Sequence, residues 1–126
     1  MAVEFALLAP AFIVLMLLLV LGGRMIEAQG QVDGAARDAA RAASVQDLVN
    51  NVPFAIRQAA DGDLYSAGHD VCTSAPNWNW HAGAGNTEVS VTVTCTVNLA
   101  FFPGLSTHTV TGHAVAPLDT YVQRNW

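Results

Sequence analysis

FALLAPAFIVLMLLLVL, residues 5–21, contains no charged or hydrogen-bonding side chain. Glu4 precedes this run, and Gly22-Gly23-Arg24 ends it. A helix from Met1 to Gly22 would be roughly 33 Å long at about 1.5 Å per residue, close to the thickness of a bilayer core. The run therefore predicts a helix that lies in lipid or in the middle of an assembly of identical helices. The rest of the chain is interpreted as a part carried outside.

A secretory signal peptide is the alternative interpretation of this run. It lacks a basic n-region, exceeds the usual apolar length of about 7–15 residues, and is followed by no persuasive small-x-small cleavage motif. A single-pass anchor normally has Lys or Arg on its cytoplasmic side, but the nearest cation, Arg24, lies at the other end. We favour an anchor or assembly helix from which a short basic leader has been removed.

Three residues within or beside the run have structural consequences. Glu4 either lies at the headgroup level or needs a cation in an apolar environment, for which the N-terminal amine of a neighbouring copy is the candidate. Pro10 removes a backbone hydrogen bond and predicts a kink. Gly22-Gly23 weakens the helix, since each glycine costs about 1 kcal/mol relative to alanine, and local melting is one of two open alternatives there.

The helix is expected to continue to Ser44 with a stripe of small side chains at helical spacing: Ala28, Val32, Ala35, Ala36, Ala39, Ala40 and Ala43. The stripe packs either on the chain's own head or on another subunit. Ser44 and Asp47 predict a break and a cap for a second helix to about Ala60. Its apolar face would comprise Val45, Leu48, Val49, Val52, Ile56 and Ala59, with Pro53 as a complication.

The residues from 64 to 86 predict mostly loop, with a short strand around His69 to Thr73. Trp78 and Trp80 alternate with Asn, so they share a face of an extended segment. They either cover a small core, which is the commoner use, or contact a sugar or a partner at the surface.

The clearest strand runs from Glu88 to Leu99, because apolar and polar residues alternate strictly along it. Cys95 lies on its apolar face, which suits a disulfide to Cys72, the first expectation for two cysteines in an exported chain. A weaker strand is expected from Ser106 to Ala116. The tail would pack back through Leu118, Tyr121 and Trp126.

The composition argues against several functional classes. The net charge is −5 and all five cations are Arg, so there is no electrostatic footprint for nucleic acid. The four His residues follow no ligand spacing, and no nucleophile elbow occurs. We expect neither a metal, a cofactor nor an enzymatic activity.

MAVEFALLAPAFIVLMLLLVLGGRM, followed by QGQVDGAARDAARAAS, resembles the TadE-like family of small pilins and pseudopilins of Tad (tight adherence) systems, within the type IV pilus superfamily. The Cys-containing Val/Thr strand and the tail APLDTYVQR are weaker parts of the resemblance, which spans nearly the whole chain. Glu4 matches the glutamate that guides docking of subunits in this family, and Phe5 matches the aromatic residue after it. The family has this glutamate at the fifth mature position, whereas here it is the fourth.

The resemblance implies a prepilin peptidase that cleaves the precursor after a glycine, an inner-membrane assembly machinery, and other pilins as partners. Together with the residue patterns it gives an α+β architecture similar to type IV pilins. Residues 1–44 would form the membrane or filament-core helix, and residues 45–126 a small head with a further helix and an antiparallel sheet of three or four strands.

The expected function is that of a structural subunit of a Tad or type IV-like pilus, with a role in adhesion. Glu4 and Phe5 would guide assembly, Pro10 would bend the helix, and the leucine-rich run with Leu15 and Leu18 would supply the association surface. The protein would lie in the cytoplasmic membrane before assembly and in an extracellular pilus afterwards. The alternative is a single-pass, membrane-anchored binding module at the cell surface that uses Trp78 and Trp80.

Overall fold

The computed structural model describes the chain except for residues 1, 66–70, 101–102, 120 and 122–125. Two α-helices, two 3₁₀ turns and three strands follow one another in the described residues. In chain order they are α1 (Ala2–Ser44), η1 (Val49–Asn51), α2 (Val52–Leu64), β1 (Asn77–Ala82), η2 (Ala84–Asn86), β2 (Glu88–Asn98) and β3 (Thr107–Pro117).

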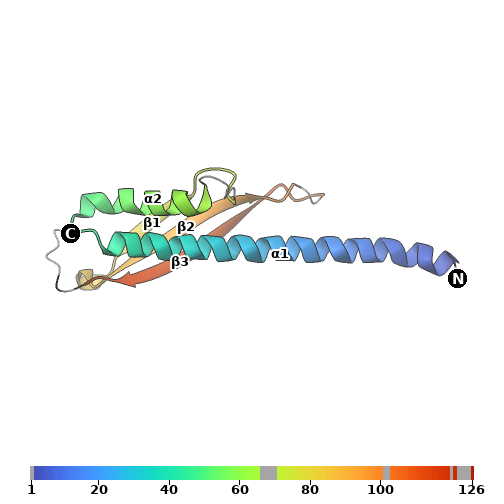
Figure 1. Cartoon of the computed structure of the whole chain (residues 1–126), viewed down its shortest axis with the longest axis horizontal. Coiled ribbons are helices and arrows are strands. Elements are labelled where there is room, and N and C mark those ends of the chain that lie inside the picture. Colours follow the sequence, from blue (N-terminus) through green and yellow to red (C-terminus); the bar gives the residue numbers. More distant parts are fainter. Residues whose placement is uncertain (1, 66–70, 101–102, 120, 122–125) are drawn as a thin grey trace.

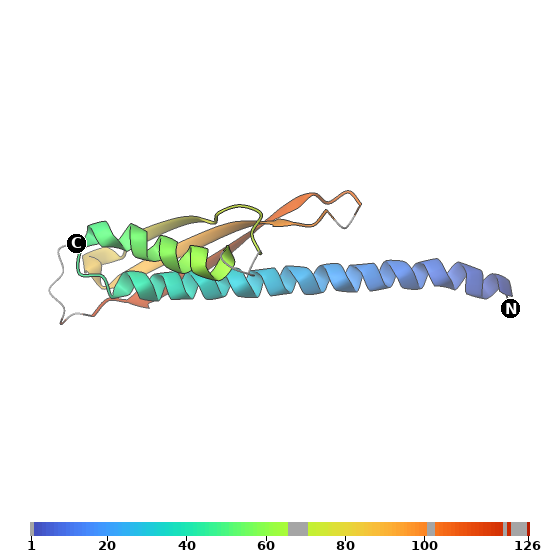
Figure 2. The ribbon, with the colours of Figure 1, turned by 45° about the horizontal axis from the view of Figure 1, so that its top comes forward.

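Helix α1 is one unbroken helix whose first half projects beyond the rest of the molecule (Figures 1 and 2). It passes Pro10 without interruption, and it also remains helical at Gly22-Gly23, where local melting had been an alternative. At Gly22-Gly23, helix propagation explains this continuity, because each of these residues added to a formed helix gains one hydrogen bond. The two halves of α1 are therefore joined by regular helix.

The chain between the two helices differs from the sequence-based prediction. Ser44 Oγ donates a hydrogen bond to the carbonyl of Arg41 at 2.8 Å, so this side chain belongs to the end of α1. The second helix starts at Val52 and not near Val45, with Pro53 in its first turn. Proline suits that position, because the first helical amides have no partner within the helix. Leu48 is extended and precedes the 3₁₀ turn, which explains why it does not contribute to a helical face.

The three strands form an antiparallel sheet in the order β1-β2-β3. The predicted strands correspond to β2 and β3, and the α+β fold class is confirmed. Strand β1 lies in a region expected to be mostly loop. The strand proposed around His69 is not found at residues 71–73, which form turns and bends, while residues 69–70 lie outside the described residues.

The second half of α1, helix α2 and one face of the sheet enclose a single hydrophobic core. All seven members of the predicted small-residue stripe of α1 are buried in it, with at most 4% of their surface exposed. They meet the valines of β2 and a row on α2 made of Val52, Ile56, Ala60 and Leu64. The interpretation that the stripe packs on the chain's own head is therefore confirmed.

Small side chains permit a close approach between α1 and β3. A Cβ atom built on Gly112 would lie 2.6 Å from the carbonyl oxygen of Val32 and 2.9 Å from the amide nitrogen of Asp33. Both are backbone atoms of α1. Beside this contact, Gln29 Nε2 donates a hydrogen bond of 3.0 Å to the carbonyl of Thr111. Only glycine fits this position of β3 at the observed spacing.

The segment after residue 117 is partly packed against the head. Leu118 is buried, and its amide donates to the carbonyl of Thr87 at 2.8 Å. Trp126 Nε1 donates to the carbonyl of Gln46 at 3.2 Å. Tyr121 is 94% exposed, so the prediction that it packs back is wrong.

Cys72 and Cys95 form a disulfide, with Cα atoms 5.5 Å apart, as the sequence had led us to expect. Both sulfur-bearing residues are buried in the core. The Thr73 amide donates to the carbonyl of Thr96 at 2.8 Å, so the segment that follows Cys72 is also fixed to β2.

Replacing both cysteines with alanine is expected to destabilise the head by about 3 kcal/mol, because the loop closed by the disulfide gains freedom in the unfolded chain. Thermal unfolding of the full chain in detergent, with and without reductant, measures the loss. Reductant should lower the unfolding temperature of the native protein but leave the double variant unaffected. Equal unfolding temperatures for the native protein and the double variant would contradict the prediction.

Candidate functional site

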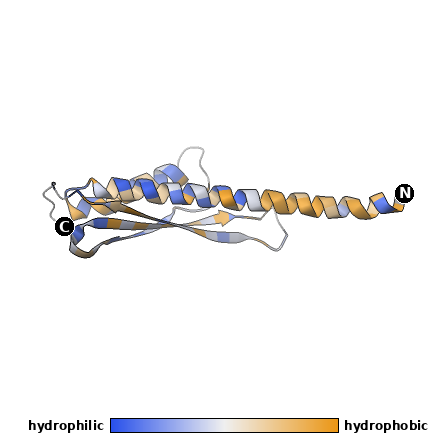
Figure 3. Ribbon diagram, turned by 90° about the horizontal axis from the view of Figure 1, so that it is seen from below, coloured by the Kyte–Doolittle hydropathy of each residue, from blue (hydrophilic) through white to orange (hydrophobic). Residues whose placement is uncertain are grey.

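The projecting half of α1 is an uncovered apolar surface. Every large hydrophobic side chain from Val3 to Val20 is exposed, from 42% at Leu17 to 73% at Val3 and Phe5. Figure 3 shows this half as an almost uniformly hydrophobic rod, in contrast to the mixed surface of the second half. Soluble monomers seldom expose a continuous apolar surface of this size, so it marks a membrane or protein interaction surface.

Length and composition make α1 able to cross a membrane, and it is the one such helix in the described part of the chain. None of the residues in the most apolar 18-residue stretch of this helix is buried inside the molecule. A helix that served as the core of a soluble protein would be mostly covered by its own chain. The N-terminal half of α1 could therefore anchor the chain in a membrane.

Glu4 lies exposed in the first turn of α1. At about 100° per residue, Glu4 shares one side of the helix with Ala11, Leu15 and Leu18. Both leucines are about half exposed. We call this side, made of Glu4, Ala11, Leu15 and Leu18, the acidic face. The structure thus places Glu4, Leu15 and Leu18 on one side of α1, and the role of these residues, Phe5 and Pro10 in assembly stays a prediction.

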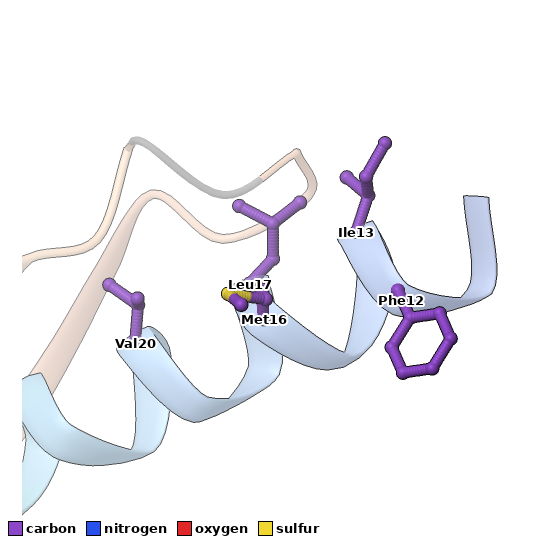
Figure 4. Close-up of a pocket in the computed structure, with 5 residues that line it drawn as sticks. All are labelled: Phe12, Ile13, Met16, Leu17 and Val20. Atoms are coloured by element: carbon purple, nitrogen blue, oxygen red, sulfur yellow. The ribbon is translucent and has the colours of Figure 1, made fainter. Parts of the chain in front are cut away.

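A shallow furrow lies on another side of the same helix. It is lined by Phe12, Ile13, Met16, Leu17 and Val20 (Figure 4). Ile13, Leu17 and Val20 are roughly opposite Glu4 at about 100° per residue. Because no polar side chain contributes to this lining, the furrow suits an apolar occupant.

The hairpin of β2 and β3 extends along α1 toward its N-terminus (Figures 1 and 2). Its tip lies on the furrow side, at a level between Leu17 and Ile13 (Figure 4). Apart from Glu88 at the start of β2, the hairpin contains no Asp, Glu, Lys or Arg. Because the tip lies on the furrow side of α1, roughly opposite Glu4, the acidic face points away from the hairpin and is not covered by it.

Trp78 and Trp80 lie on β1 opposite Val93 and Val91, on the face of the sheet that packs into the core. Both are half-buried. Trp80 also meets Trp126 edge to face, with ring centroids 5.6 Å apart. These contacts favour the interpretation that the pair covers a small core. As a contact surface for a sugar or a partner, the pair has little area left.

Among the described residues, no group of three or more His, Cys, Asp or Glu could hold a metal ion. Arg57 Nε and Asp61 Oδ2 form an ion pair at 3.4 Å, one turn apart on the surface of α2. Such an exposed pair contributes little to stability.

The position of the hairpin tip was missed by sequence reasoning. Its signal is the apolar segment LAFFPGL at residues 99–105, which connects two long strands. Each of these strands has 11 residues and is about 36 Å long at roughly 3.3 Å per residue, so the hairpin can extend beyond the core of the head. A long hairpin with an apolar turn indicates that its tip meets something apolar outside the core.

The amino-terminal third of the chain matches a known protein family. Residues 1–41 match the family model described as TadE-like protein, in agreement with the resemblance found in the sequence. The match covers the projecting half of α1 and most of the buried stripe. Comparison with curated proteins and with solved structures gave no match.

Proposed function

We propose that this chain, with its TadE-like residues 1–41, is a filament-forming structural subunit of a Tad pilus. The match and the apolar helix together fit a subunit associated with a Tad pilus. The further step, polymerisation through α1, is supported by one observation above the others. In the part of the chain that the structure describes, the large apolar side chains of the projecting half of α1 are all exposed, whereas the small-residue stripe of the second half is buried in the head.

A bundle of such helices would bury the exposed leucines and leave the heads outside. Each subunit would contact the next through different surfaces, so the contact does not close and generates a helical filament. The acidic face is suited to this contact because the chain's own hairpin does not cover it. In the proposed filament, Glu4 pairs with the N-terminal amine of a neighbouring subunit and sets the axial position, since an unpaired carboxylate among apolar helices is costly.

The proposal places the protein in the cytoplasmic membrane first and in an extracellular filament afterwards. Its proposed partners are further copies of the chain or other pilins, a prepilin peptidase that acts on the precursor, and the assembly machinery of the inner membrane. Its proposed role is structural, with surface attachment as the consequence, and not enzymatic.

Immunogold electron microscopy of sheared cell-surface material tests this proposal, with an antibody raised against residues 62–126. Continuous decoration of thin fibres is the expected result and makes the chain the principal subunit. Decoration restricted to fibre tips or bases makes it a minor subunit. Label that stays in the membrane, with every fibre unmarked, would overturn the proposal and favour an anchored surface module.

A further inference from the structure

We propose that the tip of the β2–β3 hairpin, residues Pro103, Gly104 and Leu105, inserts into the outer leaflet of the membrane beside α1. This rests on the membrane-held stage of the proposed function. The occupant of the furrow beneath the tip is then lipid acyl chain. The protein would thus contact the bilayer at two points, through a spanning helix and through a hairpin tip of its head.

The position of the tip carries the argument. It lies alongside α1 between the levels of Leu17 and Ile13 (Figure 4). These levels are four to eight residues beyond Leu21, the end of the apolar run, toward the N-terminus. The tip therefore lies roughly 6 to 12 Å past the end of the apolar run at about 1.5 Å per residue. In a bilayer spanned by that run with α1 along the membrane normal, the tip would lie below the level at which the run ends.

The composition of the hairpin agrees with this depth. No charged residue occurs between Glu88 and Asp119, so insertion of the tip desolvates no full charge. Pro103 and Gly104 are exposed, and Leu105 keeps 39% of its surface exposed although it is large and apolar. Apolar side chains at about 5–10 Å below the headgroup boundary are typical of interfacial anchors.

Backbone amides at the base of the turn have hydrogen-bond partners within the chain, which suits an apolar environment. The Leu99 amide donates to the carbonyl of Ser106 at 3.1 Å, and the Ala100 amide donates to Asn98 Oδ1 at 2.8 Å. Backbone groups without partners are costly in hydrocarbon, where water does not replace them. Two amides at the base of the turn are already paired within the chain.

The furrow identifies what lies between the tip and the helix. Its five apolar side chains are exposed, and Ile13, Leu17 and Val20 point toward the side of α1 on which the hairpin lies (Figure 4). Protein packing would require them to touch the hairpin, as the valines of β2 touch the buried stripe of α1. A flexible acyl chain fits a shallow apolar furrow with no polar group in its lining.

Fluorescence quenching in vesicles tests the proposal. The full-length Leu105→Trp protein is reconstituted into phosphatidylcholine vesicles with bromine atoms on the acyl chains, which quench nearby tryptophan. The tryptophan added at position 105 should lose most of its emission, relative to vesicles without bromine. Pro103→Trp is a second reporter at the same tip, should one of the two variants fail to fold.

Val115→Trp is the matched control. Val115 lies on β3, the strand that follows the tip, is 50% exposed, and pairs with Ser90 near the far end of the sheet. Its added emission should be unaffected by bromine. Leu15→Trp, in the apolar run, reports whether α1 is in the bilayer and should be quenched.

Quenching at position 105 no greater than at position 115 would overturn the proposal. Emission at position 105 that shifts to the blue only as protein density rises, without quenching, would also overturn it, because the tip would then contact a second copy. An unquenched Leu15→Trp would remove its premise and overturn it as well. The fibre-labelling result is separate: quenching at the tip with unlabelled fibres would leave a doubly anchored membrane protein that does not polymerise.

Discussion

Replacement of Glu4 by alanine should abolish surface fibres and leave the amount of protein in the membrane unchanged. In the proposed filament, this carboxylate neutralises the amine of an adjacent subunit in an apolar environment. Removal of the carboxylate leaves the amine as an unpaired charge among apolar helices, which strongly destabilises the contact between subunits. Insertion into the membrane does not suffer, because alanine costs less than a carboxylate within an apolar span.

The measurement combines electron microscopy of sheared material with immunoblots of membrane fractions. Glu27→Ala is the matched control, since Glu27 is an exposed carboxylate on the same helix within the head half. Among the described residues, the Glu27 carboxylate accepts a hydrogen bond of 3.5 Å from Gln31 Nε2 and makes no other side-chain hydrogen bond. Loss of the Glu27 carboxylate should therefore leave the fibres intact. Glu4→Gln should behave like Glu4→Ala if charge is what matters. Fibres at the native number in Glu4→Ala would show that Glu4 has no part in assembly.

Replacement of Gly112 by alanine should destabilise the head by about 3 kcal/mol, near the upper end of the usual cost of overpacking. The added methyl group would meet the backbone of α1 at Val32 and Asp33, and not the end of a flexible side chain. Relief requires β3 to move away from the helix, which would open the contact between the stripe and the sheet. The measurement is thermal unfolding of the full chain in detergent, followed by circular dichroism.

Gly34→Ala provides the control for this change. Gly34 lies in α1 near the same contact, but a Cβ atom built there meets nothing within 4 Å. Alanine is also favoured over glycine in a helix interior by up to about 1 kcal/mol. The unfolding temperature should therefore stay the same or rise. If Gly112→Ala unfolds at the native temperature, the close approach of β3 to α1 does not exist in solution.

Elements with strong local periodicity could be predicted from the sequence. The alternation of β2 and the alanine stripe of α1 each determine one buried face, and the two faces meet in the core, which is one of the two alternatives that the stripe left open. The cysteine pair followed from the position of Cys95 on the apolar side of β2. In each case the local pattern and the tertiary contact require the same side chains to be buried.

Other elements depend on contacts that a local pattern does not contain. NWNWHA at residues 77–82 has the composition of a loop, and it is a strand because β2 offers it a free edge. The start of α2 was misplaced because Val45 and Leu48 continue an apparent helical face, although both are exposed. Of the candidate site, the apolar run and Glu4 were evident from the sequence. The hairpin tip was not, because its position depends on the direction in which β2 leaves the core.

Continuous α-helix links the projecting apolar rod to the head across Gly22-Gly23, and this fixes the direction in which the head faces. There is no hinge to absorb a change of helical phase. One residue inserted between Gly23 and Ala28 would rotate the head by about 100° about the rod, whereas seven residues would return it to within about 20°. In a filament, the number of helical residues between the acidic face and Ala28, the first buried alanine, would thus set the direction in which each head points around the filament axis.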